Sequence, residues 1–163
     1  MKKRIIAILL TVMLLAAVMP ATSFAVSAST NYSKTTVYRT TASSLVLRKG
    51  AGTKYAKIAS LPKGTAFTVS KTSGSWYKIK VLKTGKVGWV SKKYATKSAY
   101  AKVITPVHGL NVRKGPGTKY ALIDSMPRGA VNVQITEISG NWAHVKYNKL
   151  DGWSSLSYLA WMI

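Results

Sequence analysis

The stretch Leu110-Asn-Val-Arg-Lys-Gly-Pro-Gly-Thr-Lys-Tyr120 has a near copy earlier in the chain, Leu45-Val-Leu-Arg-Lys-Gly-Ala-Gly-Thr-Lys-Tyr55. The two stretches begin 65 residues apart. Three shorter blocks follow each copy in the same order, with small changes in spacing: Leu61–Gly64 and Met126–Gly129, Ser73–Trp76 and Ser139–Trp142, and Gly88–Ser91 and Gly152–Ser155. Blocks that recur once, in one order, predict a duplicated domain rather than a short-period solenoid.

The repeat divides the chain into two units. We place the first unit at residues 35–95 and the second at residues 100–163, joined by a short linker at residues 96–99. Residues 29–34 are mostly small and polar, which is typical of a flexible leader. A linker of this length predicts that the two units touch.

Each unit is predicted to consist of short strands. In the segment Trp76–Val81, the apolar residues Tyr77, Ile79 and Val81 alternate with residues that belong on the opposite face. The segment Trp142–Tyr147 alternates in the same way, and glycine-containing turns separate such segments in both units. Several short strands in so short a unit favour an all-β fold of two tandem small barrels, because closing a sheet removes its exposed edges.

The N-terminus has the order of features of a secretory signal peptide. Residues 2–4 are basic, residues 5–19 form an apolar run, and small residues follow. Acceptable cleavage sites occur after Ala25 and after Ala28, and the sequence leaves that choice open. The apolar run is shorter than the roughly 20 residues that a membrane-spanning helix needs. We therefore expect residues 1–28 to be a cleaved signal peptide and the mature protein to be secreted, either extracellular or associated with the cell wall.

The chain is strongly basic and contains no cysteine. Its 25 Lys and Arg residues stand against 3 Asp and Glu residues, and the formal net charge is +22. The charge is uneven, since residues 34–95 carry 14 Lys and Arg and no acid, whereas residues 96–163 carry 8 Lys and Arg and 3 acids. Such a surface favours polyanionic partners. The lack of cysteine excludes disulfides, thiolate metal ligands and a cysteine nucleophile.

The repeated blocks resemble the bacterial Src-homology-3-like (SH3b) domain, which occurs in exported proteins and peptidoglycan hydrolases. Residues 110–120 match its Leu-Asn-Val-Arg-x-Gly-Pro-x-x-x-Tyr motif, and each unit contains the Gly-x-Trp and Gly-Trp motifs that follow. The first unit departs from the motif at Val46 and Ala51, where the family has Asn and Pro. The resemblance implies an SH3-like barrel in each unit and a role in binding the bacterial cell wall.

Aromatic residues are the first candidates for a ligand site. Strand alternation places Trp76 and Trp142 on the face opposite the core, where each either contacts a ligand or packs against a loop or the sister unit. In the related eukaryotic fold the equivalent Trp lines the peptide groove, together with a Tyr after the last long strand. A further Tyr follows the glycine-rich loop. Trp89 and Trp153 are instead expected to pack into the barrels. The expected ligand-binding aromatic residues are Trp76, Trp142, Tyr94, Tyr158, Tyr55 and Tyr120.

Basic residues in the glycine-rich loops are the second set of candidates. Any one of them alone is best explained as a solvated charge, but they cluster in both loops with little acid nearby. Proline-rich ligands are not expected, because Ser91 and Ser155 stand where the eukaryotic groove has a Pro. The site suits a partner that carries carboxylate or phosphate groups, such as a peptidoglycan stem peptide or a teichoic acid. The basic candidates are Arg48, Arg113, Lys49 and Lys114.

Catalysis, metal binding and cofactor binding are not expected. The carboxylates of Asp124, Glu137 and Asp151 all belong to the second unit, and glycoside hydrolysis needs two of them across a substrate cleft. His108 and His144 lie at unrelated positions with no cysteine, which does not match a zinc site. The sequence therefore predicts neither an enzyme nor a protein with a cofactor.

These observations predict a non-catalytic protein that binds peptidoglycan, or an associated anionic wall polymer, through aromatic-lined grooves and a basic surface. The alternative is a regulatory or adaptor module that binds a partner wall hydrolase or another protein. A membrane-active or nucleic-acid-binding protein is less favoured, since no amphipathic cationic helix or base-stacking surface is recognisable.

Overall fold

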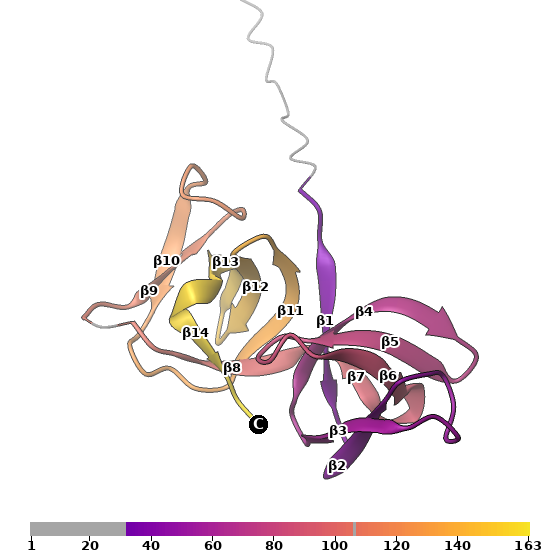
Figure 1. Cartoon of the computed structure of the whole chain (residues 1–163). Helices are drawn as coiled ribbons and strands as arrows, with labels where there is room; N and C mark the ends of the chain where they lie inside the picture. Colours follow the sequence, from indigo (N-terminus) through magenta and orange to yellow (C-terminus); the bar gives the residue numbers. More distant parts are fainter. Residues whose placement is uncertain (1–31, 106) are drawn as a thin grey trace, which may run out of the picture. The chain divides into compact units, whose positions relative to one another are not determined.

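The computed structural model describes residues 32–105 and 107–163, and within these ranges the chain is almost entirely β-structure (Figure 1). The all-β fold predicted from the sequence is confirmed. The predicted signal peptide at residues 1–28 and the first part of the predicted leader lie outside the described residues. Within the described ranges, no helix combines the length and the apolar character that crossing a membrane requires.

The two units contain corresponding elements. Those of the first unit are β1 (Thr35–Thr40), β2 (Ser44–Arg48), β3 (Lys57–Pro62), β4 (Ala66–Ser73), β5 (Trp76–Val81), β6 (Val87–Ser91), the 3-10 turn η1 (Lys92–Tyr94) and β7 (Ala95–Lys97). Those of the second unit are β8 (Ala99–Val103), β9 (Leu110–Arg113), β10 (Leu122–Met126), β11 (Val133–Ser139), β12 (Trp142–Tyr147), β13 (Leu150–Ser155), the 3-10 turn η2 (Leu156–Tyr158) and β14 (Leu159–Trp161).

Both units have the same topology. The hydrogen-bonded strand order is β3-β2-β6-β5-β4-β1-β7 in the first unit and β10-β9-β13-β12-β11-β8-β14 in the second. In each unit the short strand after the 3-10 turn pairs antiparallel with that unit's first strand (Figure 1). This shared order is the structural counterpart of the repeated sequence blocks.

Strand alternation builds the core of each barrel. Ile79 and Val81 of β5 and Ala143 and Val145 of β12 are buried, on the face that their spacing predicts. Each fully buried Val, Leu or Ile side chain contributes about 1.5–3 kcal/mol to the free energy of unfolding, so the stability of a small barrel depends on a few of them. In the first barrel the core consists of Leu45, Leu47, Leu61, Phe67, Ile79, Val81 and Val90.

An aromatic group extends the core of the first barrel. The ring of Tyr38 on β1 stacks on Phe67 with a centroid separation of 5.9 Å and lies 5.8 Å from the ring of Tyr77. Burial raises the pKa of the Tyr38 phenol, and the neighbouring Tyr77 adds to that rise. Tyr38 is therefore neutral at physiological pH and packs as an aromatic side chain.

Trp89 and Trp153 do not pack into the barrels, contrary to the expectation above. In the antiparallel ladders Trp89 lies directly across from Lys78, and Trp153 directly across from His144. Directly opposed residues share one face of a sheet, and Lys78 and His144 alternate with the buried core residues of β5 and β12. Both tryptophans therefore lie on the outer face. Trp153 is only 2% exposed because it is flanked by the rings of His144 and Tyr32, each with a centroid separation of 5.1 Å.

The passage from one unit to the next is short. The predicted linker at residues 96–99 comprises the end of β7, Ser98 and the first residue of β8, and Ser98 has a φ of 69°. The guanidinium of Arg39 donates to the backbone carbonyl of Ser98 at 3.0 Å and to its hydroxyl at 3.2 Å. Strand β1 also pairs with both units, through Thr35–Thr36 with β11 and through Val37–Arg39 with β4.

We predict that Gly88→Ala destabilises the first barrel and that Gly52→Ala does not. A Cβ at Gly88 would lie 2.8 Å from the backbone carbonyl oxygen of Arg48, which cannot move without displacing β2, whereas a Cβ at Gly52 meets nothing closer than 3.4 Å. Overpacking of this kind costs about 1–3 kcal/mol. Thermal unfolding should show a lower midpoint for Gly88→Ala alone, and equal midpoints for the two variants would contradict the close approach of β6 to β2.

Candidate functional site

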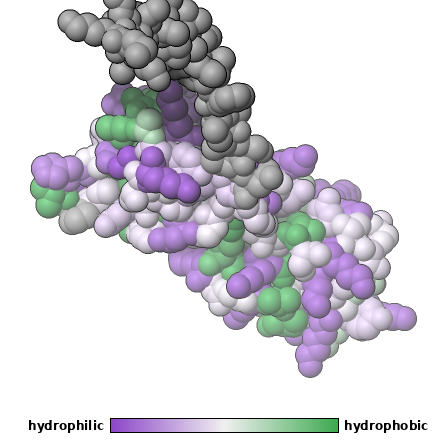
Figure 2. All heavy atoms as spheres, turned by 90° about the horizontal axis from the view of Figure 1, so that it is seen from above, coloured by the Kyte–Doolittle hydropathy of each residue, from purple (hydrophilic) through white to green (hydrophobic). Residues whose placement is uncertain are grey.

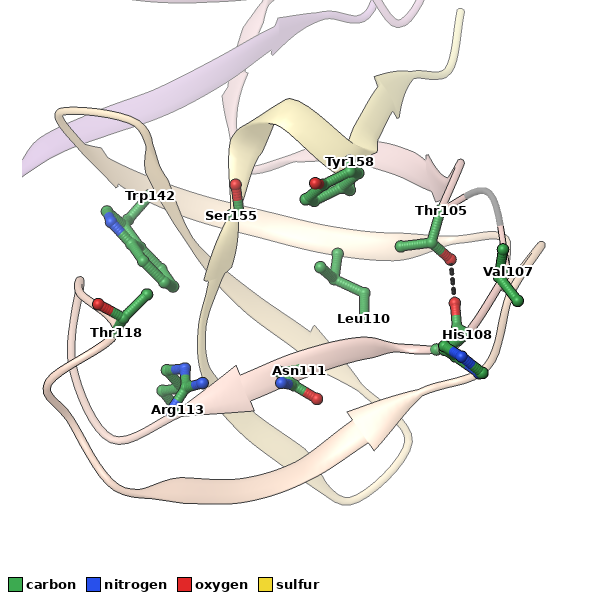
Figure 3. A pocket seen from close by; sticks show the side chains of 11 residues that line it. Thr105, Val107, His108, Leu110, Asn111, Arg113, Thr118, Trp142, Ser155 and Tyr158 are labelled. Carbon is green, nitrogen blue, oxygen red and sulfur yellow. Dashed lines mark hydrogen bonds between the residues drawn. The ribbon is translucent and has the colours of Figure 1, made fainter.

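The second barrel carries a groove with a cavity volume of about 430 Å³ (Figure 3). The aromatic rings of Trp142 and Tyr158 stand apart along it, and the side chains of Leu110 and Arg113 lie between and below them (Figure 3). Near the Tyr158 end, the hydroxyl of Thr105 donates a hydrogen bond to the backbone carbonyl of His108. The lining consists of Thr105, Val107, His108, Gly109, Leu110, Asn111, Arg113, Thr118, Trp142, Ser155 and Tyr158.

The first barrel carries the same groove, with a cavity volume of about 360 Å³. Most of its lining residues occupy positions equivalent to those of the second groove, in the order in which the repeated blocks align. The lining consists of Ser44, Leu45, Val46, Arg48, Thr53, Trp76, Ser91, Lys93 and Tyr94. A cavity that recurs with equivalent walls in both copies is a property of the fold rather than an accident of one surface.

The tryptophan of each groove is placed by a β-hairpin. Trp76 is the first residue of β5 and lies between Ser73 of β4 and Ser91 of β6 in the ladder. Its neighbour in sequence faces the core, so the indole faces outward and is partly buried. Trp142 has the same position on β12, between Ser139 and Ser155. The small serine side chains beside each indole leave its face accessible.

The tyrosine of each groove is placed by a 3-10 turn. Tyr94 ends η1 and Tyr158 ends η2, and the two phenols are 37% and 44% exposed. Each turn is attached to the loop that precedes the groove tryptophan. The backbone N–H of Lys92 donates to the carbonyl of Ser75, and the N–H of Leu156 to the carbonyl of Asn141, both at 2.9 Å. The backbone thus fixes the separation between tryptophan and tyrosine before any ligand arrives.

The arginine of each groove supports the glycine-rich loop. The guanidinium of Arg48 donates to the backbone carbonyl of Tyr55 at 2.9 Å, and Arg113 donates to the carbonyl of Tyr120 at 3.0 Å. A guanidinium has five N–H donors, so one such bond leaves donors for a carboxylate or a phosphate. Each arginine therefore holds its loop and also presents positive charge to the groove.

Tyr55 and Tyr120 belong to the loops and do not line the grooves. The ring of Tyr55 folds back over Gly50, and a Cβ there would lie 2.5 Å from the ring. The ring of Tyr120 covers Gly115 in the same way. Among the basic candidates, the exposed Lys49 and Lys114 also lie outside both linings. Of the residues selected from the sequence, the structure thus brings together Trp76, Tyr94 and Arg48 in one groove, and Trp142, Tyr158 and Arg113 in the other.

Other lining residues were not selected from the sequence. Thr53 and Thr118 lie at the same position of the repeated stretch and line equivalent walls. Their recurrence at the same position in both copies of the repeated stretch is the sequence signal that identifies these two threonines. Lys93 lines only the first groove, with its ammonium 5.6 Å from the ring centroid of Tyr94. His108 lines only the second, and the first groove has a lysine in addition to its arginine, whereas the second has an arginine and no lysine.

The three acidic side chains of the second unit lie away from both grooves. Glu137 is 3.7 Å from the ammonium of Lys34, and Asp151 contacts His144 at 2.9 Å and Lys146 at 3.0 Å. The third acid, Asp124, accepts a hydrogen bond from the adjacent backbone N–H of Ser125. In the part of the chain that the structure describes, no cluster of three or more potential metal ligands is present.

The surface is dominated by hydrophilic residues. Figure 2 shows strongly hydrophilic side chains over much of the visible face, with hydrophobic residues in small groups between them. Because residues 34–95 carry 14 basic residues and no acid, most of these charges have no opposite charge nearby. Such a field attracts anionic polymers over a range set by the ionic strength.

Comparison with protein families gives two matches within the chain. The family model described as "Bacterial SH3 domain" matches residues 43–96 and residues 108–160. The matched segments contain the Trp and Tyr residues that line both grooves.

The chain is also similar to individual known proteins. It is 30% identical over 131 residues to the "Putative N-acetylmuramoyl-L-alanine amidase YrvJ" of Bacillus subtilis (strain 168). That alignment covers 71% of this chain but 25% of the relative, so the chain spans about a quarter of that protein's length. Among solved structures, NlpC2 and NlpC1 of Trichomonas vaginalis match with 16% and 14% identity, over 78% and 83% of this chain and 48% and 49% of theirs, at TM-scores of 0.43 and 0.42.

Proposed function

This chain belongs to the bacterial SH3 domain family, and we propose that it is a secreted, non-catalytic protein that binds the bacterial cell wall. The observation that carries this proposal is the pair of equivalent grooves, each lined by a Trp, a Tyr and an Arg at corresponding positions of the two units. Two such grooves in a single chain suit a ligand that is itself a repeating polymer.

The chemistry of the grooves fits a fragment of peptidoglycan. Aromatic faces stack on the apolar faces of sugars and on peptide bonds, and the arginine suits a carboxylate such as those of the stem peptide. Leu45 and Leu110 provide an apolar floor. Cavity volumes of about 360 and 430 Å³ lie within the range of about 300–1,000 Å³ found for small-molecule sites.

Two grooves on one chain hold the protein on a polymer more tightly than either groove alone would. Once one groove is bound to a polymer, the second meets its ligand at an effective concentration that the connection between them sets. The short connection through Ser98 keeps that concentration high. Dissociation then requires that both grooves release, which favours a lasting association with an insoluble wall.

The basic surface adds a separate contribution. The uncompensated charges of the first unit attract phosphate-rich wall polymers such as teichoic acids, without any specific geometry. We infer that this field concentrates the protein at the wall and that the grooves recognise the local chemistry there.

An adaptor function is the second candidate, because the curated relative is named as an amidase and is about four times the length of the matched segment. In that case the barrels bind a partner wall hydrolase instead of, or in addition to, the wall. Pull-down with purified sacculi and with the proteins of a culture supernatant separates the two functions. Retention on sacculi alone supports wall binding, and selective capture of a hydrolase supports the adaptor.

We predict that the double variant Trp76→Ala, Trp142→Ala binds sacculi more weakly at about 1 M salt, where the Debye length is about 3 Å and the charge contribution is screened. Truncation of a central aromatic anchor commonly costs about 2 kcal/mol, which corresponds to a roughly thirty-fold loss of affinity. Sedimentation of the protein with sacculi measures this loss.

Trp89→Ala is the matched control, because Trp89 also lies on the outer face but outside the groove. It should bind as the wild type does at the same salt concentration. Thermal midpoints must be measured in parallel: a lowered midpoint in the double variant would make its tryptophans structural. Unchanged binding, or an equal loss in Trp89→Ala, would contradict the groove assignment.

We predict that the triple variant Lys80→Gln, Lys83→Gln, Lys86→Gln binds sacculi more weakly at low salt but not at high salt. These exposed lysines of the first unit do not line its groove. Exposed charges contribute about 0.2–1 kcal/mol each, so sacculus binding should weaken roughly ten-fold at low salt and match the wild type at about 1 M. A loss of the same factor at both salt concentrations would show that these residues act by something other than charge.

A further inference from the structure

The segment that precedes the first barrel lies on the second barrel. Thr35 and Thr36 of β1 pair antiparallel with Ile138 and Glu137 of β11, which adds a short strand to the edge of that sheet. A few residues earlier, the ring of Tyr32 meets the outer face of the barrel. Its centroid lies 5.1 Å from that of Trp153 and 6.4 Å from that of Tyr120, both in edge-to-face geometry.

Charge also holds this segment in place. The ammonium of Lys34 lies 3.7 Å from a carboxylate oxygen of Glu137 and 5.9 Å from the ring centroid of Trp153. The second barrel therefore accepts an extended segment with an aromatic residue and, two positions later, a cation. Three features form this seat: the edge of β11, the Trp153–Tyr120 pair and the carboxylate of Glu137.

The first barrel has a corresponding seat. In the β4–β5 ladder Lys71 lies opposite Lys78, as Glu137 lies opposite His144 in the β11–β12 ladder. Both ladders shift register immediately before this pair, between Val69 and Lys71 and between Ile135 and Glu137. Trp89 and Tyr55 stand at the positions of the repeat that correspond to Trp153 and Tyr120.

This seat on the first barrel is open in the described structure. Strand β1 pairs with β4 only from Val37 onward, because the preceding residues Thr35 and Thr36 pair with β11. Beyond Thr68, the outer edge of β4 therefore has no partner among the described strands. Residues 70–73 are accordingly exposed, whereas the equivalent residues 136–139 are half-buried. Tyr55 is 42% exposed and Trp89 partly exposed, in contrast to the 2% exposure of Trp153.

The charge of the open seat is reversed. Lys71 stands where the second barrel has Glu137, and Lys78 stands where it has His144. The chain's own leader does not match it, because Lys34 would meet Lys71. A segment with an acid at the position of Lys34 matches it in both shape and charge.

We propose that residues 70–73 of β4, with Trp89 and Tyr55, bind an extended acidic segment of a partner protein. The segment adds an antiparallel strand to β4, places an aromatic side chain against Trp89 and places a carboxylate beside Lys71. Addition of a strand to an exposed edge is a recurring mode of peptide recognition. None of these residues is among those that line either groove, so the proposal goes beyond the proposed function and does not depend on it.

The test uses the full-length mature protein and three synthetic peptides of residues 29–36: the unmodified peptide, the peptide with K34E, and the peptide with K34E and Y32A. The peptide with K34E should bind roughly ten-fold more tightly than the unmodified one, since a repulsion becomes an attraction. Replacing its tyrosine should weaken binding by a similar factor. Amide hydrogen exchange should slow at residues 70–73 when the K34E peptide is bound.

Charge reversal in the protein makes the assignment specific. Lys71→Glu should reverse the preference, so that the unmodified peptide binds more tightly. Lys83→Glu is the matched control, because it changes the net charge equally at the opposite end of the β4–β5 hairpin, and it should leave the preference unchanged. Any of four results would overturn the proposal: no binding of the K34E peptide, a preference that Lys71→Glu leaves unchanged, protection of β11 instead of β4, or protection of β4 by teichoic acid but not by the peptide. If Lys71 serves only to prevent strand pairing at the edge of β4, the K34E peptide will not bind.

Discussion

The period-two alternation of β5 and β12 is the constraint on which the rest of the structure depends. Each strand must direct its aliphatic residues inward, because Ile79 and Val145 have almost no exposure and anchor very small cores. The same alternation directs Trp76 and Trp142 outward. A barrel of this size cannot reorient one of these indoles without moving a core residue to the surface. The grooves and the cores are therefore specified by the same strands, which explains why both copies retain the two features together.

Around these strands, the backbone preorganises the grooves. The 3-10 turns are hydrogen-bonded to the loops before Trp76 and Trp142, and the arginines are hydrogen-bonded to the glycine-rich loops. Folding has already ordered the walls of each groove, so a ligand that binds there loses less affinity to the entropy cost of ordering them. The two grooves still differ in charge, because Lys93 has no basic counterpart in the second lining. The two barrels therefore present the same groove geometry with a different charge.

Much of this arrangement could be predicted from the sequence. The duplicated blocks and the alternation of Trp76–Val81 led directly to two all-β units, and local period alone placed Trp76 outward. The positions of Tyr55 and Trp153 were less accessible. Tyr55 lies over Gly50 because the loop turns back on itself, which depends on loop geometry rather than on a repeating pattern. Trp153 is buried by Tyr32, more than a hundred positions earlier in the chain, and no local pattern reports such a contact.

We propose that the two grooves, and no other tryptophan site, contact peptidoglycan. The chain contains five tryptophans, at positions 76, 89, 142, 153 and 161, so each indole N–H is a separate reporter. The most direct measurement is an NMR titration of the ¹⁵N-labelled protein with a soluble disaccharide that carries a stem peptide. We expect saturable shifts of the indole signals of Trp76 and Trp142, with those of Trp89, Trp153 and Trp161 unchanged. Shifts confined to the last three, or no saturable shift of any indole, would contradict it.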